Sequence, residues 1–198
     1  MKFYLIDRNE EMVDMWKKEF HGEDDVKVIQ GDFFSEKVDC IVSPANSFGY
    51  MDGGLDLVIS KRFGWELQGR VQSVIKNHYN GELLVGQAIL MDTRDVDIPW
   101  CIVAPTMRIP LYVPETLNAY LAARAVFLSL KDFGPSYNIN SITMSGFCTG
   151  VGAMPFGQAA KQMWMAYSDF WLGKFVYPKT WIEAKHKHAL LTGWDYKA

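Results

Sequence analysis

The sequence predicts an α/β sandwich built around a largely parallel sheet. Short apolar runs, rich in β-branched or aromatic residues, alternate along the chain with longer segments of helical periodicity. This alternation is typical of folds in which a helix follows each strand and returns the chain to the same edge of the sheet. Six apolar runs are expected to be strands: residues 3–6, 26–29, 38–42, 85–91, 101–104 and 142–144.

The segments between these runs are expected to be helices, namely residues 10–20, 55–63, 65–79, 116–133 and 157–170. In the last of them, six apolar residues fall on one stripe at helical spacing: Ala159, Ala160, Met163, Trp164, Tyr167 and Phe170. Asn9 has the position and side chain of an N-cap for the first helix, and Gly134 with Pro135 is expected to end the fourth.

Composition limits the class of protein. The 198 residues are 49% hydrophobic and 22% charged, which suits one folded domain and excludes general disorder. A formal net charge of -3 argues against binding to duplex nucleic acid. The three cysteines form no CxxC pair, and no apolar stretch has the length of a membrane span or signal peptide. We therefore expect a soluble, cytoplasmic protein without a metal site or disulfide framework.

The last part of the chain differs from the rest, because lysines and histidines are mixed there with tryptophans. We expect residues 1–172 to form the main domain and residues 173–198 to form a C-terminal appendage that packs on it.

Two glycine-rich loops follow predicted strands, at residues 43–56 and 145–155. Ligands of such sheets gather where strands end and helices begin. Glycines allow successive backbone N–H groups to converge on an anion, and a following helix adds its dipole. Two such loops could hold the two ends of a diphosphate; the alternative is that both are tight turns. Neither loop has the lysine of a P-loop or the full dinucleotide fingerprint.

These residues resemble the macrodomain family, whose members bind ADP-ribose. The stretch from Gln30 to Asp56 is similar to the family signature, in which Gly-Asp precedes a buried strand, an Ala-Asn pair and a glycine cluster. The second loop is similar to the family's phosphate loop. The resemblance covers residues 1–170 and implies a three-layer α/β/α sandwich with a mixed, largely parallel central sheet.

The resemblance also implies roles for single residues. Asp32 matches the aspartate that accepts a hydrogen bond from the adenine amino group, and Phe33 matches its neighbour, whose backbone meets the base. Asn46 matches the asparagine that contacts the distal ribose. The residues expected beside the ribose and the diphosphate are Gly53, Gly54 and Leu55 in the first loop and Thr149, Gly150, Val151 and Gly152 in the second. The residues alone leave alternatives open, since Asp32 could cap a turn and Asn46 could stabilise its own loop.

Gly152 stands where many family members carry an aromatic residue near the distal ribose. Phe48 and Tyr50 of the first loop are candidates to supply that surface from the other side.

Asp56 follows the glycine cluster, where members that cleave mono-ADP-ribose from acidic side chains carry an aspartate. The resemblance implies that Asp56 and Asn46 are catalytic. Asp56 would orient or deprotonate the water that attacks the anomeric carbon, while Asn46 fixes the ribose. The alternative is that Asp56 only interacts with the dipole of the following helix.

The expected function is therefore binding of ADP-ribose with hydrolysis of ADP-ribosyl linkages. One alternative is a non-catalytic ADP-ribose-binding module, and a further one is a phosphatase that processes ADP-ribose 1″-phosphate. None of these needs a metal or another cofactor. The expected partner is ADP-ribose or an ADP-ribosylated substrate, with no duplex nucleic acid and no membrane. A monomer is favoured, and the oligomeric state is left open.

Overall fold

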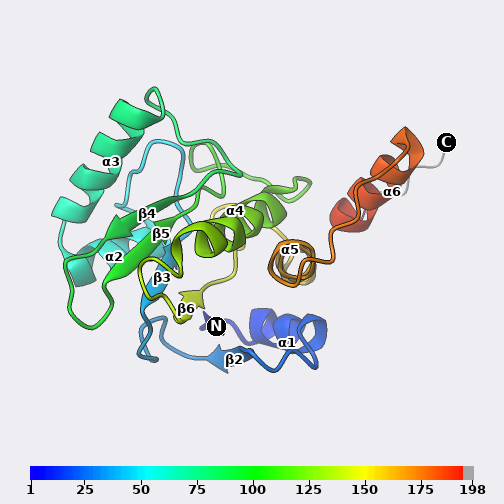
Figure 1. Ribbon diagram of the computed structural model, residues 1–198, viewed down its shortest axis with the longest axis horizontal. Coiled ribbons are helices and arrows are strands. Elements are labelled where there is room, and N and C mark those ends of the chain that lie inside the picture. Colours follow the sequence, from blue (N-terminus) through cyan, green and yellow to red (C-terminus); the bar gives the residue numbers. More distant parts are fainter. Residues whose placement is uncertain (194–198) are drawn as a thin grey trace.

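A six-stranded sheet forms the centre of the computed structural model, which describes residues 1–193 (Figure 1). The strand order is β2-β1-β6-β3-β5-β4. Neighbouring strands are parallel except at one edge, where β4 runs antiparallel to β5. The strands are β1 (Lys2–Asp7), β2 (Val26–Gln30), β3 (Cys40–Ser43), β4 (Ile89–Asp92), β5 (Trp100–Val103) and β6 (Ser141–Met144).

Helices cover both faces of this sheet (Figure 1). They are α1 (Glu10–Glu19), α2 (Gly54–Phe63), α3 (Glu66–His78), α4 (Asn118–Phe133), α5 (Phe156–Ala166) and α6 (Trp181–Thr192). One buried cluster joins the sheet to α1, α4 and α5, and a second joins it to α2 and α3. Strand β3 contributes to both, because Cys40 and Val42 belong to the first cluster and Ile41 to the second. The three-layer α/β/α sandwich with a mixed, largely parallel sheet is thus confirmed.

The helix ends follow local rules. The side chain of Asn9 accepts a hydrogen bond from the N–H of Met12 at 3.2 Å, as an N-cap does. Helix α4 ends at Phe133, directly before Gly134 and Pro135. These two predictions from single residues agree with the structure.

Three local predictions differ from the structure. The strand predicted for residues 85–91 covers only Ile89–Asp92, because Gln87 donates its backbone N–H to the Leu84 carbonyl and closes a turn there. The helix predicted for residues 157–170 changes at Tyr167 into a π-helix that runs to Trp171 (η1). Helix α6 lies in the segment expected to pack as an appendage, for which no helix was predicted.

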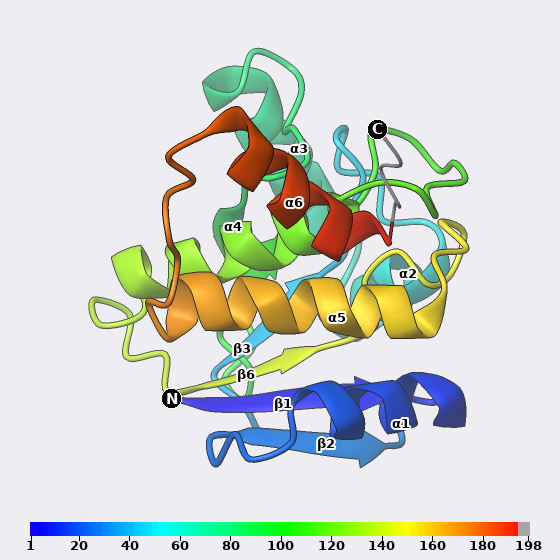
Figure 2. The same ribbon diagram turned by 90° about the vertical axis from the view of Figure 1, so that its right-hand side faces the viewer.

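Helix α6 lies outside the layer formed by α4 and α5, on the side away from the sheet (Figures 1 and 2). Leu191 of α6 is buried, and its carbonyl accepts a hydrogen bond from the buried amide of Gln162 on α5. Lys187 pairs with Asp169 at 3.0 Å. The division into a main domain, residues 1–172, and an appendage stays a prediction. In the part of the chain described, no helix is long and apolar enough to cross a membrane.

Candidate functional site

Two adjoining pockets lie along the edge of the sheet where the parallel strands end. The first has a volume of about 230 Å³ and the second about 360 Å³. Asp7, Gly54, Leu55 and Ser145 line both, so the pockets form one continuous cleft. Every residue predicted to bind the ligand or to act in catalysis lines this cleft. Asp32 and Phe33 line the first pocket, Gly54 and Leu55 line both, and the second is lined by Asn46, Gly53, Asp56, Thr149, Gly150, Val151 and Gly152.

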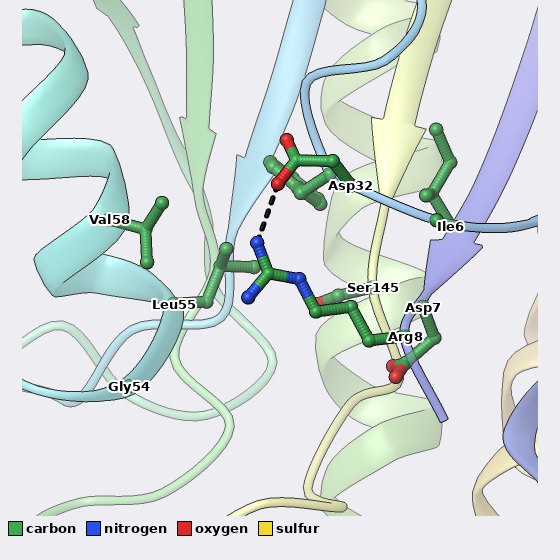
Figure 3. Close-up of a pocket in the computed structure, with 10 residues that line it drawn as sticks. Ile6, Asp7, Arg8, Asp32, Gly54, Leu55, Val58 and Ser145 are labelled. Carbon is green, nitrogen blue, oxygen red and sulfur yellow. Dashed lines mark hydrogen bonds and ion pairs between the residues drawn. The ribbon is translucent and has the colours of Figure 1, made fainter. Parts of the chain in front are cut away.

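The first pocket has apolar walls and a charged pair at its centre (Figure 3). Ile6, Leu55 and Val58 supply apolar surface. Asp32 accepts the backbone N–H of Phe34 at 3.0 Å and the Arg8 guanidinium at 2.6 Å. The Phe34 N–H, followed by Arg8, holds the pKa of the Asp32 carboxyl below its ordinary value. Asp32 is thus ionised and acts as a hydrogen-bond acceptor at neutral pH.

Two further residues of the cleft were not predicted from the sequence: Asp7, the last residue of β1, and Arg8, which directly follows it. Asp7 accepts the backbone N–H of Asn9 at 2.9 Å and that of Gly146 at 3.2 Å. It therefore ties the end of β1 to the loop after β6. The signal was present, since polar residues follow a predicted strand, but only the strand order shows that β1 ends between β2, which precedes Asp32, and β6, which precedes the second loop.

In the second pocket, the first loop presents the start of helix α2. Gly53 is the N-cap, and no side chain caps the first backbone N–H groups of the helix. Gly54 has a φ of +54°, a left-handed conformation that glycine adopts without strain. The positive end of the α2 dipole and its uncapped N–H groups therefore lie at the pocket wall.

The second loop presents a further set of backbone donors. Within residues 1–193, the N–H groups of Thr149, Gly150, Val151 and Gly152 donate to no other protein group. The loop itself is fixed, because Thr149 donates its hydroxyl to the Gly146 carbonyl at 2.9 Å and Val113 donates its N–H to the Gly152 carbonyl. The pocket thus has unsatisfied donors on two of its walls, which suits an anionic group.

Gly152 has no room for a side chain. A Cβ atom there would lie 2.5 Å from the Cys148 carbonyl oxygen and 2.8 Å from the Val113 side chain. An aromatic residue at this position would therefore force the loop to move. Tyr50 lines the pocket instead and is 56% exposed, whereas the ring of Phe48 lies 5.1 Å from the Arg108 guanidinium carbon, outside the pocket lining.

Asn46 lines the second pocket and also holds its own loop together. Its Nδ2 donates to the Tyr50 carbonyl at 2.7 Å, and its Oδ1 accepts the N–H groups of Phe48 and Tyr50. An amide nitrogen carries two hydrogens, so one remains for a ligand. The loop-stabilising role and the ligand role are therefore compatible.

Asp56 is a buried carboxyl group at the back of the second pocket. Its Oδ1 accepts the hydroxyl of the buried Ser43 at 2.6 Å, and its Oδ2 accepts no hydrogen bond from the described residues. Burial raises the pKa of Asp56 to about 6, and the nearby Asp52 adds to the rise, whereas the Ser43 hydroxyl opposes it. A carboxyl group with a pKa near neutrality and a free oxygen is suited to general base chemistry.

Cys148 also lines the second pocket, but its thiol is unsuited to act as a nucleophile. Burial raises its pKa to about 12, and its Sγ lies 3.6 Å from the Thr106 carbonyl oxygen. The thiolate form is therefore scarce at neutral pH. Within residues 1–193, no three His, Cys, Asp or Glu side chains form a group that could hold a metal ion.

Known proteins share this architecture. The family model described as Macro domain matches residues 42–163. An uncharacterized protein of Aquifex aeolicus is 33% identical over 139 residues, which cover 70% of this chain and 78% of that protein. The macrodomain of Mycobacterium tuberculosis DarG is 18% identical with a TM-score of 0.60, over 70% of this chain and 87% of the other.

A variant of the Oceanobacillus iheyensis macrodomain, solved with ADPR, is 23% identical with a TM-score of 0.59, over 71% of this chain and 74% of the other. At such identities the structural matches show the fold alone. The match of the family model over more than half of the chain, together with the Aquifex aeolicus relative, shows more than the fold. The chain belongs to the macro domain family.

Proposed function

We propose that the cleft binds ADP-ribose. The observation that carries this proposal is the order of chemical groups along one continuous cleft. An apolar pocket with the Asp32 carboxylate lies at one end, two walls of free backbone N–H groups follow, and the Asp56 carboxyl lies in the second pocket. Adenine, a diphosphate and a distal ribose need these groups in this order.

Relatives support the ligand class. The Oceanobacillus iheyensis variant was solved with ADPR, and Thermosipho africanus DarTG was solved in complex with ADP-ribose. Three variants of the Oceanobacillus iheyensis macrodomain have been solved in which an asparagine, a glycine or an aspartate is substituted. The glycine lies seven positions after the asparagine, and the aspartate lies three positions after the glycine. Asn46, Gly53 and Asp56 have the same two separations.

We further propose that the protein hydrolyses the bond between ADP-ribose and an acidic side chain. Water attacks the anomeric carbon of the distal ribose, the bond from that carbon to the ester oxygen breaks, and the carboxylate of the substrate leaves. The free oxygen of Asp56 accepts the proton from the attacking water, while Ser43 holds the other oxygen. Asn46 and the backbone donors keep the ribose and the diphosphate in place.

Calorimetric titration with ADP-ribose, ADP and AMP tests the binding proposal. The wild type should bind ADP-ribose with a dissociation constant in the micromolar range, roughly -8 kcal/mol, and more tightly than ADP. Asp32→Ala should weaken ADP-ribose binding by about tenfold or more, because it removes the acceptor for the base. Absence of ADP-ribose binding by the folded wild type would refute the proposal.

Release of ADP-ribose from a mono-ADP-ribosylated protein tests the hydrolase proposal. Asp56→Ala should lose activity by about a hundredfold or more, and its affinity for ADP-ribose should stay close to that of the wild type. Asp14→Ala is the matched control, because Asp14 is an exposed carboxylate on α1 that lines neither pocket, and it should leave turnover unchanged. If the wild type binds ADP-ribose and shows no turnover, the protein is a binding module.

A further inference from the structure

The first pocket is spanned by an ion pair between Arg8 and Asp32 (Figure 3). The Nη2 of Arg8 lies 2.6 Å from the Oδ2 of Asp32, and both side chains are largely exposed, at 77% and 53%. Arg8 extends from the end of β1, and its guanidinium lies between Asp32 and Leu55 (Figure 3). Exposed ion pairs contribute little to folding, so stability does not account for this arrangement.

The geometry of a guanidinium leaves its flat faces available. Its hydrogen bonds lie in the plane of the group, and the one to Asp32 holds one edge of that plane against the carboxylate. Asp32 also retains acceptor capacity, because an ionised carboxylate has about four lone-pair sites and two hydrogen bonds occupy it here. Asp32 can therefore hold Arg8 and accept a further donor from a ligand at the same time.

From this geometry we infer that Arg8 is a base-binding residue, whose guanidinium packs on one face of the purine while the apolar wall of Leu55 and Val58 lies against the base from the other side. This inference rests on the proposed function and adds to it a residue with a separate task. Asp32 reads the amino group at the edge of the base, and Arg8 binds the ring face. A flat cation on an aromatic ring gains both cation–π attraction and stacking contact.

The two tasks predict different responses to a change in the base. A ring face is the same whether or not the base carries an amino group. Loss of Arg8 should therefore weaken adenine and hypoxanthine ligands equally. Loss of the Asp32 charge should act mainly on adenine, because hypoxanthine has an oxo group where adenine has its amino group.

Calorimetric titrations with ADP-ribose and inosine diphosphate ribose test this inference on the full chain. The variants are Arg8→Met, which keeps the length of the side chain, Arg8→Lys, which keeps its charge, and Asp32→Asn with and without Arg8→Met. Arg8→Met should weaken binding of both ligands by about tenfold, and Arg8→Lys by about threefold or more. The loss caused by Arg8→Met should persist in the Asp32→Asn background.

Arg94→Met is the matched control, because Arg94 is also exposed and paired, with Glu66 at 3.5 Å, but lines neither pocket. It should leave both affinities unchanged, and thermal melting should show that all variants are folded. Unchanged or tighter binding by Arg8→Met would overturn the inference, because Arg8 would then be a bystander or an obstacle in the pocket. The inference would also be overturned if Arg8→Met no longer weakened binding in the Asp32→Asn background, since Arg8 would then act only through Asp32. A wild type that does not bind ADP-ribose would instead refute the proposed function, and this inference with it.

Discussion

At the scale of single residues, Asp56 is held by the fold in a place that disfavours its charge. Its carboxyl is buried, with a pKa of about 6 against an ordinary value of 3.8, and the hydrogen bond from the Ser43 hydroxyl only partly offsets the effect of burial. Between these two values the folded state binds more protons than the unfolded state, so the free energy of unfolding falls as pH rises. The shift of about two pKa units corresponds to about 3 kcal/mol at neutral pH.

Asp56→Asn should therefore stabilise the protein at neutral pH. The amide oxygen can still accept the Ser43 hydroxyl, and the variant has no charge to bury. We expect the free energy of unfolding at pH 7.5 to rise by up to about 3 kcal/mol and the difference from the wild type to vanish below about pH 4. Urea unfolding at several pH values measures this.

The control for this prediction is Asp14→Asn, which changes an exposed carboxylate paired with Lys17. It should alter stability by less than about 1 kcal/mol at either pH. A stability difference for Asp56→Asn that is independent of pH would contradict the assignment of a raised pKa to Asp56.

The residue types in the sequence predicted which residues line the cleft, but they did not predict which side chains contact one another there. Asp32, Asn46 and Asp56 stand in loops whose glycines and flanking strands are visible in the sequence, and all three line the cleft. The partners that tune them were not predictable. Ser43 meets Asp56 because a strand end faces a helix start, and Arg8 meets Asp32 because β1 lies beside β2. Both contacts depend on tertiary geometry.

At the scale of elements, periodicity and residue type predicted the strands and the first five helices, most of which bury apolar side chains against the sheet or the helices. The prediction failed where that signal is absent or ambiguous. Val85 is β-branched and typical of a strand, but Gly86 adopts a φ of +96° and the chain turns there. Helix α6 has apolar residues on several sides, and Trp181 and Ile182 are largely exposed, so its sequence shows no single buried stripe.

Polar contacts help to attach helix α6, and Lys187 makes two of them. Its ammonium pairs with Asp169 at 3.0 Å, where both side chains are mostly buried, and lies 3.8 Å from the centre of the Phe175 ring. Lys187→Met should weaken docking of α6 by about 1–2 kcal/mol. Amide hydrogen exchange in residues 181–192 should become about tenfold faster, with exchange in α5 unchanged.

Lys17→Met is the control for Lys187, since Lys17 belongs to an exposed pair on α1. It should leave exchange in α6 as it is in the wild type. Unchanged exchange in α6 for Lys187→Met would mean that other contacts, such as those of Leu191, hold the helix without Lys187.

At the scale of the whole molecule, the strand order decides what the cleft contains. Parallel strands place their carboxyl ends at one edge, which is why the loops after β3 and β6 could be expected to meet. The sequence does not show that β1 lies between β2 and β6. This position brings Asp7 and Arg8 to the cleft and explains why sequence reasoning identified the walls of the cleft but not the pair that spans its first pocket.

The cleft depends on α5 more directly than on the C-terminal helix α6. The loop before α4 reaches the second pocket through Met107 and Pro110. Two glutamines of α5 hold that loop. Gln158 donates to the Pro114 carbonyl at 2.6 Å, and Gln162 donates to the Thr116 carbonyl at 2.8 Å. Only one contact of Gln162, that with the Leu191 carbonyl, involves α6. Removal of α6 would therefore leave the loop attached to α5.

We predict that a chain of residues 1–172 folds and binds ADP-ribose within about threefold of the full chain. Its free energy of unfolding should fall by about 2–4 kcal/mol, because the truncation exposes surface covered by Leu191 and removes the Lys187 pair. Calorimetry and urea unfolding measure the two quantities. Leu191→Ala in the full chain removes the packing of this side chain but keeps residues 173–198. It should reproduce part of the stability change and leave the affinity for ADP-ribose unchanged. A truncated chain that folds but binds more than tenfold more weakly would show that residues 173–198 help to form the cleft.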